Sequence, residues 1–260
     1  MKTLEFTVQG AVAIIRINRP EVRNAINQQM ISELGQCQQR VADNPDIRAV
    51  LMTGNGKSFC AGADLMDVME APSPPEGIKN LLEFGKKSFI TTLNMPVPVV
   101  SAVNGVAAGG GVGVALAADV VIAGRSASFV QTFGPKLGLV PDLCSSWFYT
   151  QALGVKRALP LMLLGEKLSA EQAAEWGLVW KTVDDDVLFD TALDVAQQLA
   201  AGPNEAFMRI RHQALQAQHN SIEQQYDLET KNNIELAGQS DCTEGVMAFL
   251  EKRDPKFARR

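Results

Sequence analysis

The order of apolar and polar positions predicts strands that alternate with helices over the first two thirds of the chain. Residues 4–8 and 11–17 are short runs rich in β-branched side chains, separated by Gln9-Gly10, which predicts an opening hairpin. Residues 28–41 carry apolar side chains at helical spacing, and residues 47–53 form an apolar run of strand length. This succession predicts an α/β fold with a largely parallel sheet.

The same succession returns further along the chain. After a turn at 54–57, the prolines of residues 72–75 predict a loop or flexible insertion before a helix over 78–93. The elements expected next are a strand at 97–103, a small-residue helix at 109–118, a strand pair at 119–123 and 127–129, a short helix with a capping box of Ser169 and Gln172, and a strand at 178–183.

From residue 185 onward the pattern is helical only. We expect helices over roughly 185–200, 203–217, 221–238 and 241–251. We expect a core over residues 1–200, which would hold the ligand site, and a C-terminal helical oligomerisation region over residues 201–260.

Composition and charge narrow the function classes. Hydrophobic residues make up 46% and charged residues 20%, as in ordinary globular proteins, and the net charge of -5 disfavours a nucleic-acid partner. The N-terminus lacks the apolar core of a signal peptide, and no apolar run reaches the ~18 residues of a membrane span. The four cysteines form no CxxC pair, which favours a reducing compartment. We expect a cytoplasmic protein with no membrane association.

Two glycine-rich stretches follow predicted strands, at residues 58–65 and 101–119. Glycine and alanine at such junctions let a ligand approach the backbone, and a helix N-terminus offers unpaired N–H donors. Two such loops side by side would direct two N–H groups at one oxygen, as an oxyanion hole does. Either stretch alone is equally compatible with a tight turn. A dinucleotide site is disfavoured, because the second stretch lacks the G-x-G-x-x-G spacing.

Several motifs in this order resemble the crotonase (enoyl-CoA hydratase/isomerase) superfamily over nearly the whole chain. They are NRPEVRNAI (18–26), SFCAGADL (58–65), PVVSAVNGVAAGGG (98–111), KLGLVPD (136–142), LLGEKLSAEQAAEWGLV (163–179) and FLEKRDPKF (249–257). The resemblance implies a β-β-α spiral core with a C-terminal helical trimerisation subdomain, in a homotrimer or hexamer. It also implies an acyl-CoA thioester as substrate, with coenzyme A entering as part of that substrate and no metal or other cofactor.

The resemblance also assigns residues. It implies that the backbone N–H groups of Ala63 and Gly110 form the oxyanion hole. The residues that it places along coenzyme A are Arg23, Ala25, Ala61, Asp64 and Leu65, together with Phe249 and Lys252, which often reach coenzyme A from a neighbouring subunit. Asp64 also suits a helix cap, and Arg23 a solvated surface position.

The sequence departs from the hydratases at their two catalytic glutamates. Gly113 and Gly134 stand at the matching positions, and the one acid nearby is Asp142, where related isomerases carry an acid. One carboxylate is enough to take a proton from the α-carbon of a thioester and return it to the γ-carbon. Asp142, with Ser145 three residues on, would also cap a helix. The side chains expected to make its pocket apolar are Phe133, Leu143, Trp147 and Phe148; Phe133 is also expected to contact the acyl group.

Within the superfamily, the motifs resemble most the enoyl-CoA isomerases and the ring-epoxide isomerase of phenylacetate degradation. The interpretation is an enoyl-CoA isomerase that shifts a double bond or isomerises a ring, with Asp142 as its acid and base. Two alternatives stay open: an enoyl-CoA hydratase that works without the glutamates, and a catalytically weak acyl-CoA-binding protein. A histidine-based metal or Ser-His-Asp site is disfavoured, because His212 and His219 both lie in the glutamine-rich helical tail.

Overall fold

The computed structural model describes residues 1–258. The chain opens with the predicted hairpin, in which β1 (Leu4–Gln9) pairs antiparallel with β2 (Val12–Ile17). Strand β2 then pairs in parallel with β3 (Ala49–Gly54), whose residues are all buried. Helix α1 (Gln28–Asp43) connects these two strands, and its N-cap is Asn27, whose side chain accepts the Met30 N–H. The β-β-α start expected from the sequence is confirmed.

The larger sheet has the order β1-β2-β3-β5-β7-β10 within residues 1–258. Its remaining strands are β5 (Val99–Val103), β7 (Val120–Gly124) and β10 (Lys181–Val183). Every pairing after the hairpin is parallel, as the alternation of strands and helices predicted.

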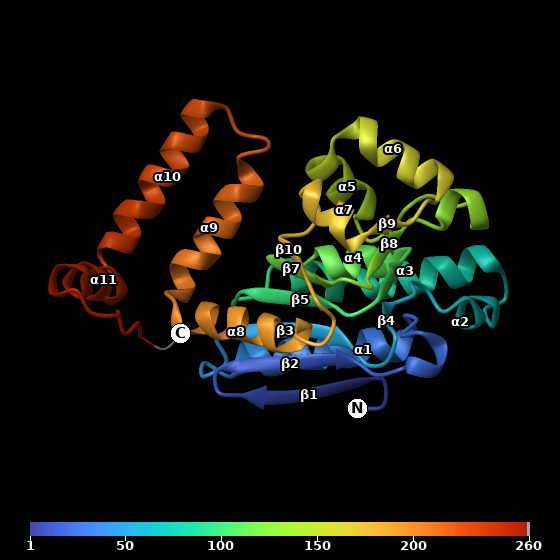
Figure 1. The fold of residues 1–260 in the computed structure, drawn as a ribbon, viewed down its shortest axis with the longest axis horizontal. Coiled ribbons are helices and arrows are strands. Elements are labelled where there is room, and N and C mark those ends of the chain that lie inside the picture. Colours follow the sequence, from blue (N-terminus) through green and yellow to red (C-terminus); the bar gives the residue numbers. More distant parts are fainter. Residues whose placement is uncertain (259–260) are drawn as a thin grey trace.

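A smaller sheet of short strands lies beside the larger one. It has the order β4-β6-β8-β9, with β4 (Ser58–Cys60), β6 (Val106–Ala108), β8 (Ser128–Val130) and β9 (Leu168–Ser169). The expectation that 119–123 and 127–129 pair with each other is wrong, because the chain turns between β7 and β8 and enters the second sheet. β3 and β4, β5 and β6, and β7 and β8 each follow this path, so the core is a spiral of β-β-α units (Figure 1).

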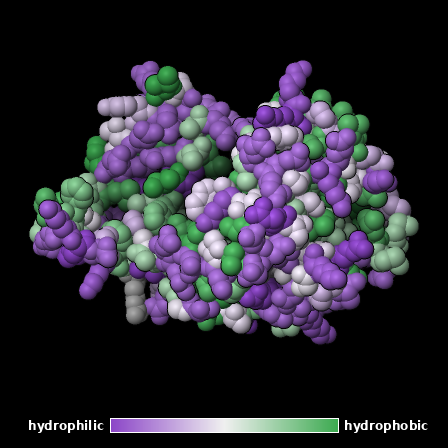
Figure 2. All heavy atoms as spheres, viewed as in Figure 1, coloured by the Kyte–Doolittle hydropathy of each residue, from purple (hydrophilic) through white to green (hydrophobic). Residues whose placement is uncertain are grey.

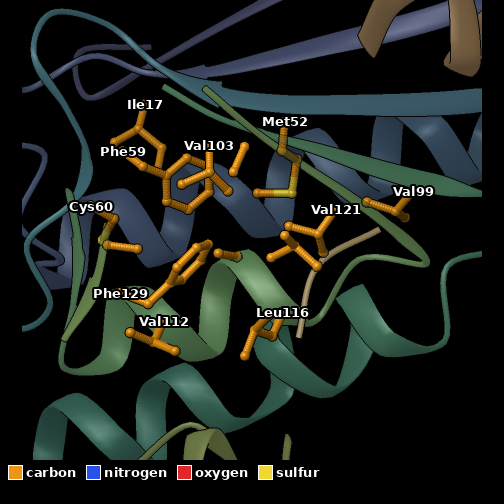
Figure 3. Packing of buried hydrophobic residues seen from close by; sticks show 14 of the residues in the cluster. Ile17, Met52, Phe59, Cys60, Val99, Val103, Val112, Leu116, Val121 and Phe129 are labelled. Carbon is orange, nitrogen blue, oxygen red and sulfur yellow. The ribbon is translucent and has the colours of Figure 1, made fainter. Parts of the chain in front are cut away.

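The main apolar core fills the space between the two sheets and helix α4 (Gly110–Leu116). Figure 3 shows Phe59 of β4 and Phe129 of β8 packed beneath Met52 and Val103 of the larger sheet, with Leu116 of α4 closing the other side. These side chains come from all three β-β-α units, so the core fixes the units against one another.

Helix α3 (Pro74–Leu93) packs on α1 and follows the short α2 (Leu65–Met69). The expectation of a loop over 72–75 is wrong in its second half, because α3 begins at Pro74. Proline is tolerated in the first turn of a helix, where its missing N–H would have no helical partner.

Some helices have no counterpart in the sequence prediction. They are the 3₁₀ turn η1 (Pro20–Val22), the π-helical segment η2 (Phe133–Leu137) and α6 (Val155–Leu164). Helix α5 (Ser145–Leu153) begins three residues after Asp142, where the sequence allowed a helix start. Helix α7 (Ala170–Glu175) does begin at the predicted Ser169–Gln172 capping box.

The chain ends in the expected helices. They are α8 (Leu188–Ala201), α9 (Asn204–Gln216), α10 (Ile222–Ala237) and α11 (Ser240–Glu251). Helix α8 covers the outer face of the larger sheet, whereas α9–α11 extend to one side (Figure 1). Arg211 fixes α9 to the core, because its guanidinium pairs with Asp119 and donates to the carbonyl oxygens of Met95 and Val97.

The arm formed by α9–α11 has exposed apolar side chains. They include Ile210, Ile222, Tyr226, Ile234 and Phe249. Figure 2 shows hydrophobic atoms in green among the polar ones on this side of the molecule. Among residues 1–258, no helix combines the length and the apolar character needed to cross a bilayer.

Candidate active site

The two glycine-rich loops lie against each other because glycines stand where they touch. A Cβ on Gly62, whose φ is +89°, would lie 2.8 Å from the Ala108 carbonyl oxygen. A Cβ on Gly111 would lie 2.2 Å from the Cys60 carbonyl oxygen. Both distances are too short for a real contact, so only glycine fits. The start of α4 therefore rests directly on the loop after β4, as expected for two loops that share one site.

The 61–64 loop also runs beside the segment that precedes α1. The Ala61 N–H donates to Arg23 O at 3.0 Å, the Ile26 N–H to Gly62 O at 2.7 Å and the Asp64 N–H to Ile26 O at 2.9 Å. Among the backbone hydrogen bonds of turns, loops and caps in residues 1–258, none uses the N–H of Ala63 or of Gly110, and Gly110, as the first residue of α4, has no helical acceptor for its N–H. Both residues line one cavity, so two free donors are available there.

That cavity, of about 50 Å³, is mainly apolar and lies between α1, α3 and α4. Its lining side chains are Ile26, Met30, Ile31, Leu34, Leu81, Leu82, Phe89, Val114, Leu143, Ser88, Thr92 and Asp142, with Ala63, Gly85, Gly110 and Ala117. Among these lining residues of the described chain, Asp142 is the one ionisable group. A cavity of this size accepts water molecules.

The Asp142 carboxylate is held at Gly110. A Cβ on Gly110 would lie 2.9 Å from Asp142 Oδ1, so a side chain there would collide with the carboxylate. Oδ1 is buried and has no hydrogen-bond partner among residues 1–258. Burial raises the pKa of Asp142 from 3.8 to about 6, against a smaller opposite effect of its own backbone N–H. The pKa of Asp142 therefore lies closer to neutral pH than that of an exposed aspartate.

The alternative that Asp142 only caps a helix is wrong. Helix α5 begins at Ser145, its N-cap is Cys144, and no side chain caps it. The Asp142 main-chain carbonyl, and not its carboxylate, accepts the Ser145 N–H at 2.9 Å. The carboxylate is free for another role.

A glutamate would not serve the cavity at either of the two positions that match the hydratase glutamates, Gly113 and Gly134. A Cβ on Gly113 would lie 2.2 Å from Leu143 O, so the chain after Asp142 occupies the space of a side chain there. Gly134 is exposed on η2 and does not line the cavity of the described chain.

The expected apolar surroundings of Asp142 are partly wrong. Leu143 lines the cavity, but Trp147 and Phe148 pack edge to face, with ring centres 5.2 Å apart, outside its described lining. Phe133 is buried against Gly109 and is also outside that lining. The apolar wall comes from α1 and α3, far away in sequence. The helical spacing of Met30, Ile31 and Leu34 marked one buried face, but not what that face covers.

The residues predicted along coenzyme A fall into two groups. Arg23, Ala25, Ala61, Asp64 and Leu65 lie together on the adjoining η1–α1 and β4–α2 segments. Asp64 caps α2 by accepting the Met66 N–H and pairs with Arg19 at 2.9 Å. Arg23 is exposed and, with φ at 55°, ends η1.

The second group, Phe249 and Lys252, lies at the end of α11 and is exposed. Both residues therefore belong to the α9–α11 arm, whereas the first group belongs to the segments around η1 and β4. His212 and His219 are also exposed, and no cluster of three metal-ligating side chains occurs in residues 1–258.

The structure is an α/β spiral in which Ala63, Gly110 and the Asp142 carboxylate line one cavity, and comparison with known proteins identifies the family. The family model described as Enoyl-CoA hydratase/isomerase matches residues 7–260. The chain belongs to the enoyl-CoA hydratase/isomerase family, as the motifs predicted.

Individual relatives cover almost the whole chain. The 1,2-epoxyphenylacetyl-CoA isomerase of Escherichia coli (strain K12) is 43% identical over 254 residues, which cover 96% of each chain. A probable enoyl-CoA hydratase of Rhodobacter capsulatus is 38% identical, covering 99% of this chain and 98% of its own. The crystal structure of an enoyl-CoA hydratase from Polaromonas sp. JS666 matches with a TM-score of 0.93 at 32% identity, covering 98% of this chain and 99% of its own.

Proposed function

We propose that this enzyme is an enoyl-CoA isomerase in which Asp142 is the acid and base. The observation that supports this most strongly is the single carboxylate of the cavity, which lies at Gly110 with an unpaired, buried oxygen. Moving a double bond from the 3 to the 2 position requires one group that removes a proton at one carbon and returns it at another.

The reaction would begin with ionised Asp142. Its carboxylate takes a proton from the α-carbon of a 3-enoyl thioester, and the electrons of that C–H bond form a dienolate whose negative charge rests on the thioester oxygen. The carboxylic acid then gives the same proton to the γ-carbon, which leaves a 2-enoyl thioester and restores the carboxylate. A pKa near 6 suits both steps, because the group is mostly ionised at pH 7 and holds a proton readily.

The Ala63 and Gly110 N–H groups would hold the dienolate oxygen. Loss of one such donor costs about 3–4 kcal/mol of transition-state stabilisation in well-studied enzymes. Neither N–H is used in a backbone hydrogen bond of the described residues, so neither has to break a bond before the substrate binds.

The surrounding residues would bind the rest of the substrate. We assign coenzyme A to the surface formed by Arg23, Ala25, Ala61, Asp64 and Leu65, and the acyl group to the cavity between α1 and α3. A homotrimer or hexamer would bury the apolar side chains of the α9–α11 arm and bring Phe249 and Lys252 of one subunit to the coenzyme A of the next. Light scattering that gives a monomer would refute this assembly.

Hydration is the second candidate, favoured by the name of the Rhodobacter capsulatus relative. It requires a water activated on one side and a proton delivered to the α-carbon. In this chain Gly113 leaves one carboxylate for both tasks, which favours isomerisation. The third possibility, a weak acyl-CoA-binding protein, would not explain the buried, unpaired carboxylate.

The test measures isomerisation of 3-enoyl-CoA esters and of 1,2-epoxyphenylacetyl-CoA, and hydration of crotonyl-CoA, by wild type and Asp142→Asn. The Asn variant keeps the shape of the side chain and removes the base. Asp194→Asn, at an exposed position on α8, is the matched control. We expect isomerisation by wild type and the control, with at least a roughly 100-fold loss in Asp142→Asn. Hydration at a comparable rate would favour the hydratase, and binding without turnover by wild type would favour the acyl-CoA-binding protein.

A further inference from the structure

The turn that carries Asp142 has a conformation that L-residues rarely adopt. Leu143 and Cys144 are consecutive and both lie in the left-handed region, with φ of 44° and 56°. Residues in such conformations persist where the surrounding structure holds them, and they often occur at functional sites. The position of the Asp142 carboxylate therefore depends on whatever holds this turn.

Ser145 holds the turn from one side. It is fully buried and donates both its N–H, at 2.9 Å, and its hydroxyl, at 2.7 Å, to the Asp142 carbonyl oxygen. The Leu143 carbonyl packs against Gly113 on the other side. The turn is thus fixed at the residue that bears the carboxylate and at the residue after it.

Behind Ser145 lie two further buried polar side chains. Gln131, which follows β8, is fully buried, and its Oε1 lies 3.5 Å from Ser145 Oγ. The Gln131 Nε2 atom and the buried Tyr149 hydroxyl have no hydrogen-bond partner of good geometry among residues 1–258. Burial raises the pKa of the Tyr149 phenol, and the Gln131 side chain opposes that rise.

The chemistry of these groups defines one consistent arrangement. A serine hydroxyl has one hydrogen to donate, and that of Ser145 goes to the Asp142 carbonyl at the shorter distance. Ser145 Oγ can therefore act only as an acceptor toward Gln131. With the Gln131 amide turned so that Nε2 faces Ser145, Nε2 donates to Oγ, and Oε1 accepts the Tyr149 O–H. Both buried groups without a partner are then satisfied.

We infer that Tyr149, Gln131 and Ser145 form a hydrogen-bonded positioning chain that holds the Asp142 turn, and with it the carboxylate, at the oxyanion hole. The inference rests on the proposed function of Asp142. None of the three side chains lines the cavity of the described residues, so they act through Asp142 and not on the substrate. Their contribution is to keep one carboxylate within reach of both the α- and the γ-carbon, where a displacement of about 1 Å can cost on the order of 100-fold in rate.

The test compares Ser145→Ala, Gln131→Leu and Tyr149→Phe with the control Ser101→Ala. Ser101 is also buried, and its hydroxyl has no partner among residues 1–258, but it lies on β5 away from the turn. We expect kcat for isomerisation of a 3-enoyl-CoA to fall about 10- to 100-fold in Ser145→Ala and Gln131→Leu, and by less in Tyr149→Phe. KM should not change. The acid limb of the pH profile should move to lower pH, because a displaced carboxylate is better solvated. Ser101→Ala should behave as wild type.

Tyr149→Phe removes one oxygen and keeps the ring, so it remains informative if a Gln131 variant does not fold. Unchanged kcat and an unchanged acid limb in folded Ser145→Ala and Tyr149→Phe, with Asp142→Asn inactive, would overturn the positioning chain and leave the proposed function intact. Full activity of Asp142→Asn would instead overturn the proposed function.

Discussion

Asp142→Asn should make the protein more stable while it abolishes isomerisation. The folded protein holds the Asp142 carboxylate in an apolar cavity with a buried, unpaired oxygen, and the unfolded chain exposes it to water. Ionisation is therefore less favourable in the folded state. Asparagine has the same shape without the charge, so the substitution removes that cost.

The size of the effect follows from the pKa. Because the pKa in the folded protein is raised from 3.8 to about 6, the folded state binds the proton more tightly, and stability falls as the pH rises between these values. Above pH 6 the full penalty applies, at most about 3 kcal/mol. The amide introduced by the substitution would itself lack partners, so we expect a net gain of about 1–2 kcal/mol. For a chain of this length that is a rise in Tm of roughly 2–8 °C.

The assay is thermal unfolding followed by circular dichroism between pH 8 and pH 5, at one protein concentration because assembly also shifts Tm. The gap between Asp142→Asn and wild type should be largest at pH 8 and narrow steadily below pH 6, whereas Asp194→Asn should track wild type. A lower Tm for Asp142→Asn than for wild type at pH 8, or a difference in Tm that does not depend on pH, would refute the view that the buried carboxylate destabilises the folded protein.

Four other outcomes follow from the structure. The kcat/KM for isomerisation should fall as the pH decreases through about 6, since the base must be ionised; a flat profile from pH 5 to 8 would contradict this. Gly113→Ala should cost about 1–3 kcal/mol in urea unfolding and lower kcat, because its Cβ meets the Leu143 carbonyl. Glu33→Gln should cost about 1.5–3 kcal/mol at pH 7, because the carboxylate accepts three backbone N–H groups and a hydroxyl near the N-terminus. Burial alone would raise the pKa of Glu33, but these hydrogen bonds together lower it to about 2, so the loss relative to wild type should shrink as pH falls below 4.5. Arg211→Ala should cost about 2–4 kcal/mol and speed hydrogen exchange in α9, and equal exchange would show that the arm is held by other contacts.

Local patterns predicted the elements with strong periodicity. The hairpin, α1, the parallel strands and the C-terminal helices each carry their signal within a few residues, and the Ser169–Gln172 capping box is a purely local device. The smaller sheet was missed because its strands have two or three residues, too short for a period to show. Helix α6 was missed because it contains Pro160, and the cap expected of Asp142 is absent from the start of α5.

The sequence predicted that the two glycine-rich loops lie side by side, and the structure confirms this contact. At Gly62, Gly110 and Gly111 a Cβ would collide with atoms of a neighbouring segment, so the packing requires glycine. The glycines themselves are read directly from the sequence. The apolar wall was not predicted, because α1 and α3 meet only through the fold. Trp147 and Phe148 were wrongly placed for the opposite reason: nearness in sequence to Asp142 does not decide which way a side chain on α5 points.

The most direct test of the account follows one hydrogen atom. A 3-enoyl-CoA that carries deuterium at the α-carbon is converted by the wild-type enzyme in ordinary water, and the position of deuterium in the 2-enoyl product is read by NMR at early times. If Asp142 alone carries the proton between the two carbons, part of the deuterium appears at the γ-carbon, and Asp142→Asn gives no product. Rapid conversion by Asp142→Asn, or a γ-carbon that takes its new hydrogen only from water in the earliest product, would contradict the one-carboxylate mechanism.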